Sequence, residues 1–154
     1  MTGERPRSEF ELHIELELAR SLVECARAHE PREACGLLLG RAACATRVVE
    51  VENLAAEIGR FEAHPGQWCA ALDSAVREGE VALAAWHSHV GGAALPGLRD
   101  VDTRWKELPI LVVAPAGRPR LRAWRLVEGA WRELKLQIGA PPSEEAPTPS
   151  MFRP

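Results

Sequence analysis

The chain has 154 residues, of which 46% are hydrophobic and 27% charged, enough for one hydrophobic core and too short for two ordinary domains. Nineteen lysines and arginines stand against 22 aspartates and glutamates, so the net charge is -3. No excess of positive charge exists to neutralise a nucleic-acid backbone. The longest apolar runs fall well short of the ~18 residues that a membrane span needs. These numbers exclude nucleic acid and membrane as expected partners.

The N-terminal segment, residues 1–7, carries charge and has no apolar stretch directly behind it, so we expect no secretory signal and a cytoplasmic protein. The four cysteines form no Cys-x-x-Cys pair, and thiols in a reducing compartment stay free. We therefore expect buried thiols that pack as small apolar groups at Cys25, Cys35, Cys44 and Cys69.

The first third of the chain alternates strand and helix patterns. Residues 11–14 alternate polar and apolar side chains and predict a short strand. Apolar residues recur at three- and four-residue intervals over 15–29, which predicts an amphipathic helix that ends before Pro31. The apolar run 34–40 predicts a strand covered on both faces, and a further strand is expected over about 46–51.

The middle of the chain repeats this alternation. Residues 53–66 lack a clear period and predict a loop. A second helical stripe begins near Trp68 and ends near Gly79. The apolar residues 81–86 predict a buried strand, followed over 91–97 by a loop rich in glycine.

The last third predicts a short helix over 98–106 and strands over 110–114, 121–127 and 131–138. Strands that alternate with helices and are then followed by a run of strands predict an α/β fold, a mixed sheet flanked by helices. Beyond Gly139 the composition shifts to Pro, Ser and Glu, which cannot build a core.

These patterns predict one domain over residues 1–139 and a flexible, Pro-rich tail over 140–154. A docking role for the tail stays open beside the simpler reading of a solvated segment.

Two histidines stand at the exit of the predicted strand over 81–86. The two-residue period of a strand turns the rings of His87 and His89 to one face and Ser88 to the other. Asp100 follows eleven residues after His89, beyond the glycine-rich loop. Two imidazoles and one carboxylate make three metal ligands and leave a fourth position for water, as in a catalytic zinc site. From spacing alone, polar strand-end histidines and a helix-capping aspartate remain an equal alternative.

The wider sequence context favours the metal site. The segment Trp86–Asp100, WHSHVGGAALPGLRD, resembles the signature of the JAMM (MPN-plus) metalloproteases, His-x-His-Pro followed by five residues and Pro-Ser-x-x-Asp. Both histidines, Pro96 and Asp100 fall in register. The segment Pro31–Gly40, PREACGLLLG, is similar to that family's first motif, whose glutamate is the catalytic acid and base.

The likeness covers about residues 11–138, because Asn53, Phe61 and the segment 122–126 also stand where small bacterial members have similar segments. It implies an α/β/α sandwich of the kind shared with cytidine deaminases. It also implies a zinc-dependent peptidase that cleaves a peptide or isopeptide bond after the C-terminal tail of a ubiquitin-like or sulfur-carrier β-grasp protein.

Carried over by position, the resemblance implies that His87, His89 and Asp100 bind zinc. Glu33 then activates the water at the fourth position and passes its proton to the leaving amine. As structural alternatives, Glu33 forms an ion pair at a strand start, and Glu24 and Glu30 stand nearby on a helix.

Two positions depart from the family signature. Val90 replaces the proline after the second histidine, and Gly97 replaces the serine whose hydroxyl holds the oxyanion. Losing one such donor costs ~10² to 10³ in rate. Gly97 therefore supports an alternative function, a catalytically weakened or silent binding or scaffold domain of the same fold. A zinc deaminase is excluded, because its His-x-Glu and Pro-Cys-x-x-Cys motifs are missing.

The resemblance also suggests a substrate groove beside the zinc, which would take an extended tail by strand addition. Gly91 and Gly92 let backbones approach closely there, and His64 is assigned as a further lining residue. His13 and His29 are instead assigned to a strand surface and to the dipole of a helix C-terminus.

Overall fold

The structure is a computed structural model that describes residues 11–97 and 107–139. The predicted helix over 98–106, which contains Asp100, and the predicted tail over 140–154 lie outside the described residues.

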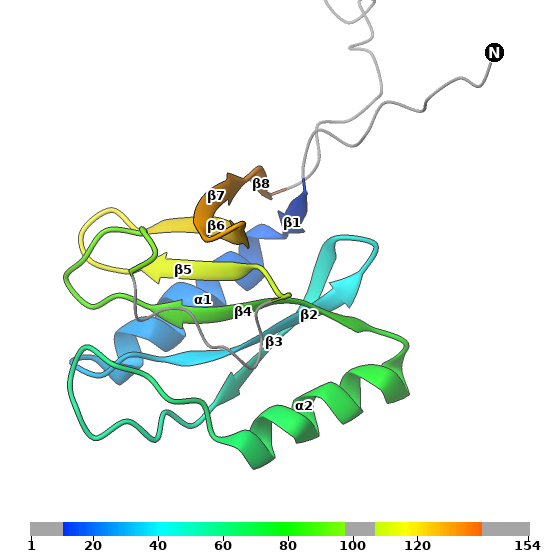
Figure 1. Ribbon diagram of the computed structural model, residues 1–154, viewed down its shortest axis with the longest axis horizontal. Coiled ribbons are helices and arrows are strands. Elements are labelled where there is room, and N and C mark those ends of the chain that lie inside the picture. Colours follow the sequence, from blue (N-terminus) through cyan, green and yellow to red (C-terminus); the bar gives the residue numbers. More distant parts are fainter. Residues whose placement is uncertain (1–10, 98–106, 140–154) are drawn as a thin grey trace, which may run out of the picture.

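One mixed sheet forms the centre of the described chain (Figure 1). Its strand order is β7-β6-β5-β4-β2-β3-β1-β8. Three neighbouring pairs are parallel, β4 with β5 and β1 with both β3 and β8, and the others are antiparallel. The strands are β1 Leu12–Ile14, β2 Cys35–Arg41, β3 Cys44–Val51, β4 Val81–Ser88, β5 Ile110–Ala114, β6 Arg120–Val127, β7 Ala130–Leu134 and β8 Leu136–Ile138.

Two helices cover opposite faces of this sheet, α1 (Leu16–His29) and α2 (Pro65–Glu78). The alternation along β2 shows this directly. Leu38 packs in the cluster that contains the buried stripe of α1, whereas Leu37 and Leu39 pack with Trp68 of α2. The prediction of an α/β/α sandwich is therefore confirmed.

The final strand predicted over 131–138 is two strands in the structure. β7 pairs with β6 and β8 pairs with β1, at opposite ends of the strand order, and only Lys135 separates them. The carbonyl of Lys135 accepts from the backbone N–H of Glu11 and of Leu12. The sheet is twisted so strongly that its two edge strands, β7 and β8, meet at Lys135.

The start of α2 also differs from prediction. Pro65 and Gly66 were expected in a loop, but α2 begins at Pro65. The Nδ1 of His64 accepts from the backbone N–H of Gln67 at 3.1 Å, and proline suits the first helical position. Gly79 ends the helix with φ 68°, in the left-handed conformation that favours glycine.

The neighbouring strands leave no room for a side chain at Gly36 of β2. A Cβ at this position would stand 1.9 Å from the carbonyl oxygen of Val49 and 2.8 Å from the indole nitrogen of Trp86. The Nε1 of Trp86 donates to that same carbonyl at 3.3 Å. Gly36 thus lets β4 and β3 bond across the face of β2, which fixes the position of β4, the strand that carries the two histidines.

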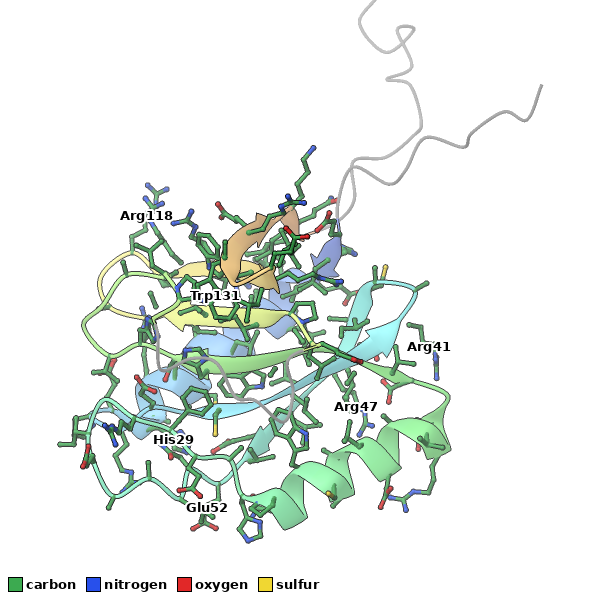
Figure 2. All side chains as sticks on the ribbon, in the orientation of Figure 1. His29, Arg41, Arg47, Glu52, Arg118 and Trp131 are labelled. Atoms are coloured by element: carbon green, nitrogen blue, oxygen red, sulfur yellow. The ribbon has the colours of Figure 1, made fainter. Side chains whose placement is uncertain are left out.

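A polar cluster joins the C-terminal end of α2 to the sheet, where Figure 2 shows Arg41 and Arg47. Glu80 is nearly fully buried and lies 2.8 Å from the Nη2 of Arg47. The hydroxyl of Thr46 and the guanidinium of Arg47 donate to this carboxylate and hold its pKa below the ordinary value. Arg41 donates to the carbonyl of Gly79 at 3.2 Å.

The cysteines are free thiols, as expected, but they are not all buried. Cys35 is buried and Cys25 half-buried, whereas Cys44 and Cys69 are exposed. The prediction of buried thiols is wrong for the last two, because Cys44 starts a strand after a tight turn and Cys69 stands on the outer side of α2. Neither helix of the described chain is long and apolar enough to cross a membrane.

Candidate functional site

The two histidines of the signature meet at the end of β4. His87 is the penultimate residue of this strand and His89 follows it directly. Their Nε2 atoms lie 3.0 Å apart and their ring centroids 4.9 Å apart. The strand period therefore brings the two rings together as predicted.

Each ring is oriented by a contact outside β4. His87 is buried and stacks on Phe61, with ring centroids 4.5 Å apart and planes at 19°. The Nδ1 of His89 lies 3.0 Å from the carbonyl oxygen of Ala93. Since a carbonyl only accepts, Nδ1 carries the hydrogen and the lone pair of Nε2 faces His87. Metal-binding histidines are commonly held in this way.

The loop after His89 is anchored to the sheet. The indole Nε1 of Trp124 donates to the carbonyl of Ala94 at 3.1 Å, and Ala94 is buried. Gly91 turns the chain with φ 68°, and it is exposed, as is Gly92. Gly97 is exposed at the end of the described loop. The loop is thus held in its middle at Ala94 and exposed at Gly91, Gly92 and Gly97.

Glu33 approaches the histidines through the pairing of β2 with β4. Cys35 is the partner of His87, and the next pair is bonded because the N–H of Ser88 donates to the carbonyl of Ala34 at 2.9 Å. One further step in this antiparallel register puts Glu33 opposite His89. Only 7% of Glu33 is exposed. Of the predicted site, the structure brings His87 and His89 into contact, and the register places Glu33 on the neighbouring segment.

Two side chains hold the backbone of this glutamate segment. The hydroxyl of Ser88 accepts from the N–H of Ala34 at 2.8 Å, in a fully buried position. The Nδ2 of Asn53 donates to the carbonyl of Glu33 at 2.9 Å, and its Oδ1 accepts from Ala55 and Glu62. Asn53 thus ties the loop after β3 to the start of β2.

Local sequence patterns assign Ser88 no role beyond turning away from the metal, and they assign Asn53 only a place in the resemblance. Their positioning roles depend on long-range contacts, across 54 and 20 residues of sequence. Asn at the start of a loop is a local turn signal, but it does not reveal the distant carbonyl.

A cleft of ≈ 520 Å³ opens beside Glu33. Figure 2 shows His29 and Glu52 at this end of the molecule. The cleft is lined by His29, Arg32, Glu33, Glu50, Val51, Glu52, Asn53 and Gln67. Three carboxylates against one arginine make it acidic. The side chain of His64 caps α2, and its place in a substrate groove stays a prediction.

Cys35 lies next to Glu33 in sequence, and its thiol is not a nucleophile. Burial first, and then the nearby Glu33 and Glu50 carboxylates, raise its pKa to about 12. The thiol is therefore protonated at neutral pH. The structure agrees with the interpretation of Cys35 as a core residue.

The donor set at the end of β4 fits a divalent transition metal. Two imidazole nitrogens converge, one ring is oriented by a backbone carbonyl and the other by an aromatic stack, and a buried carboxylate stands opposite. The predicted third ligand, Asp100, lies outside the described residues, so its role stays a prediction.

Comparisons with known proteins agree with this architecture. A family model described as prokaryotic homologues of the JAB domain matches residues 15–127. A curated relative from Thermus thermophilus, named a probable TtuB-protein conjugate cleaving protease, is 36% identical over 120 residues. The match covers 74% of this chain and 78% of the relative.

Solved structures share the fold. The solution structure of a Desulfitobacterium hafniense protein has a TM-score of 0.73 and 24% identity, covering 82% of this chain and 92% of its own. A structure described as a JAMM metalloprotease-like zinc site in the proteasome and signalosome has a TM-score of 0.54 and 14% identity, covering 84% and 98%. The family model spans most of the chain, and the chain belongs to the family of prokaryotic JAB-domain homologues, with the JAMM/MPN fold.

Proposed function

We propose that this chain is a cytoplasmic zinc-dependent peptidase that cleaves the peptide or isopeptide bond after the C-terminal tail of a ubiquitin-like or sulfur-carrier protein. The observation that carries the proposal is the pair of imidazole nitrogens 3.0 Å apart, opposite a buried glutamate. The name of the Thermus relative, a protease that cleaves TtuB-protein conjugates, supports a protein conjugate as substrate. The JAMM neighbour, described by its zinc site, supports zinc.

His87 and His89 would hold the zinc ion through their Nε2 atoms, together with Asp100 as the resemblance implies. Zinc would polarise the scissile carbonyl and lower the pKa of a water molecule towards ~7. His89 keeps its Nε2 aimed at this position because its Nδ1 donates to Ala93. His87 cannot rotate freely because its ring is stacked on Phe61.

Glu33 would be the acid and base. Its carboxylate accepts a proton from the attacking water and then delivers this proton to the leaving nitrogen, so that carboxylate and site are regenerated. The backbone of Glu33 is held by Asn53 and, through Ala34, by Ser88. This fixed backbone would limit the positions that the carboxylate can take during proton transfer.

The tail would not bind by adding a strand to β4, since β4 is paired with β2 and β5 on its two sides. We place it instead between the loop 90–97 and the segment 53–63. Phe61 brings that segment next to His87, and its ends pair through a bridge between Asn53 and Ala63. Gly91 and Gly92 leave room for a second backbone on the opposite side.

Gly97 favours a second function, a binding or scaffold domain that keeps the fold but is catalytically weakened or silent. The family signature has a hydroxyl donor at this position, and glycine offers only its backbone N–H. The two functions predict the same metal site and differ in turnover.

Cleavage of a fusion between a small β-grasp carrier and a reporter at its C-terminal glycine tail tests the proposal. Purified protein is loaded with zinc, and cleavage is followed by mass spectrometry together with the metal content. We expect the wild type to cleave and bind zinc, and His89→Ala to lose cleavage and at least tenfold in zinc affinity. His13→Ala, on β1, is the matched control and should keep both.

Intact fusion together with a normal zinc content would support the silent domain. A wild type that neither cleaves the fusion nor binds zinc at the β4 histidines would contradict both functions.

A further inference from the structure

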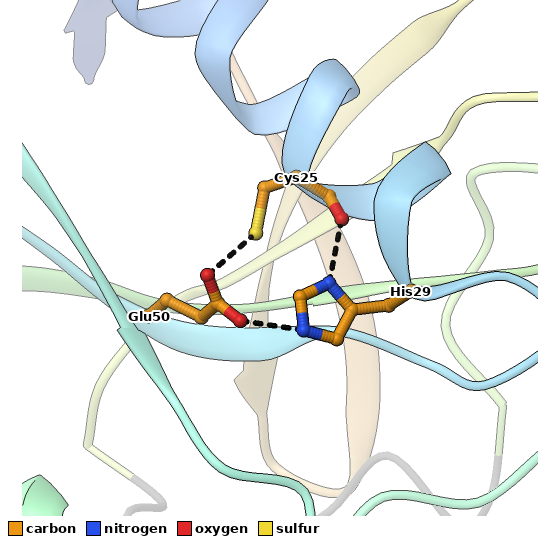
Figure 3. Close-up of side chains that lie close together, drawn as sticks. All are labelled: Cys25, His29 and Glu50. Atoms are coloured by element: carbon orange, nitrogen blue, oxygen red, sulfur yellow. Dashed lines mark hydrogen bonds and ion pairs between the residues drawn. The ribbon is translucent and has the colours of Figure 1, made fainter.

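A second group of metal-ligating side chains lies between α1 and β3. Cys25 and His29 stand four residues apart, one helical turn, and thus share a face of α1. Glu50 of β3 reaches the same point (Figure 3). The thiol sulfur, an imidazole nitrogen and a carboxylate oxygen all lie within 4.8 Å of one another. This group contains none of the residues assigned to catalysis.

His29 is oriented as metal-binding histidines are. Its Nδ1 lies 2.8 Å from the carbonyl oxygen of Cys25, so Nδ1 carries the hydrogen. Its Nε2 lone pair then points at the Oε1 of Glu50, 2.6 Å away. Two electron-rich atoms at this distance need a positive species between them, either a proton on Nε2 or a metal ion. The backbone hydrogen bond therefore aims the ring at a cation position.

Cys25 completes the donor set. Its Sγ donates to the Oε2 of Glu50 at 3.2 Å. Burial first, then the hydrogen bond to Glu50 and its charge, raise the pKa of this thiol to about 12. The thiol is therefore inert as a nucleophile without a cation. A bound divalent metal would replace the thiol proton, which leaves to solvent, and would bind the thiolate directly.

We propose that Cys25, His29 and Glu50 form a second transition-metal site, separate from the β4 histidines, with zinc as the fitting ion. Sulfur, nitrogen and oxygen donors together suit zinc and exclude calcium and magnesium, which take oxygen ligands. In a tetrahedral zinc site the ligand atoms stand about 3.5 Å apart, so His29 and Glu50 separate by about 1 Å on binding.

The position of the site gives it a structural role. It joins the last turn of α1 to β3, and the chain leaving α1 leads through Pro31 to Glu33. His29 and Glu50 also line the cleft beside Glu33, so the fourth coordination position faces a space open to water or a substrate group. The site braces the segment that carries Glu33, and it does not depend on the proposed protease activity.

Metal counting in a His87→Ala/His89→Ala double variant isolates this site. After chelation, reduction and reloading with zinc, we expect one equivalent of bound zinc by elemental analysis, and its loss when Cys25→Ser is added. Cys44→Ser is the matched control, because it removes an exposed thiol instead. Glu50→Gln is a second variant at an exposed position and should weaken binding at least tenfold. A double variant that binds no zinc, or that keeps its zinc after Cys25→Ser, would overturn the proposal.

Cobalt provides a second readout on the wild type. The ligands assigned at β4 are nitrogen and oxygen, so a sulfur-to-cobalt charge-transfer band in the near ultraviolet reports only on Cys25. We expect this band in wild type and Cys44→Ser, and its loss in Cys25→Ser and His29→Gln. A cobalt-loaded wild type without the band would refute the site, whatever the activity of the enzyme.

Discussion

The two histidine clusters of this molecule are built by the same local device in different surroundings. His89 and His29 each donate from Nδ1 to a backbone carbonyl four residues away. Each ring turns its Nε2 towards another side chain that can bind a metal, His87 in the first cluster and Glu50 in the second. In the first cluster both imidazoles come from one end of one strand. In the second, the ligands come from a helix and a strand that meet only in the folded chain. The orientation of a ring is thus a local property, whereas the composition of its cluster is a tertiary one.

The largest effect is expected from changing two carboxylates of the cleft one at a time, Glu33 and Glu52. Glu33→Gln keeps the shape and removes the base, so we expect kcat to fall by ~10² to 10⁴ with zinc content unchanged. Steady-state cleavage of the carrier fusion measures it. Glu52→Gln, in the same cleft, should change kcat less than about threefold. Equal losses in both variants would mean that the charge of the cleft, and not Glu33 itself, supports cleavage.

The second change restores the family hydroxyl beside the first cluster. If the chain is a weakened enzyme, Gly97→Ser supplies a missing oxyanion donor and raises kcat by up to ~10² to 10³, with KM little changed. Metal content, measured in parallel, should stay constant. An unchanged kcat would favour the silent binding domain.

The third change tests the support under Glu33. Ser88→Ala removes the acceptor of the buried Ala34 N–H, so we expect a loss of about 1–3 kcal/mol in the free energy of unfolding, measured by urea denaturation. Ser21→Ala, on the exposed side of α1, should stay within about 0.5 kcal/mol. An effect on stability alone leaves the kcat of the folded protein unchanged. A reduced kcat in folded Ser88→Ala would therefore show that the hydroxyl also positions Glu33.

The smallest expected effect concerns Glu80, which belongs to neither cluster. Its folded-state pKa is below the ordinary 4.5, because Thr46 and Arg47 donate to the charged form. This stabilisation is present above pH 4.5 and is lost as the pH falls through the folded-state pKa. Glu80→Gln should therefore lower the melting temperature at pH 7 and lower it less in acid. Glu107→Gln, exposed and outside the cluster, is the control. A difference that does not change with pH would assign the effect to packing.

Much of this fold could be predicted because its signals are local. The stripe of α1 and the apolar run of β2 each follow a period that short-range sequence displays. The break at Lys135 could not be predicted, since both halves of that segment are ordinary strand sequence and only their partners differ. The start of α2 depended on recognising His64 as a capping side chain.

The candidate sites divide along the same line. The two-residue spacing of His87 and His89 on a strand is enough to predict that their rings converge. Glu33 could be chosen over its neighbours only through the family resemblance. The spacing of Cys25 and His29 was a visible signal, but Glu50 joins them only because α1 packs on β3. No local pattern contains that contact.

The closure of the sheet at Lys135 has a consequence for the behaviour of the protein in concentrated solution. β7 and β8, the border strands, have five and three residues and are linked by one. An unprotected edge strand can pair with an edge strand of another molecule and start aggregation, and short edge strands limit such pairing. We expect light scattering of the native protein to stay low at concentrations where proteins with long open borders self-associate.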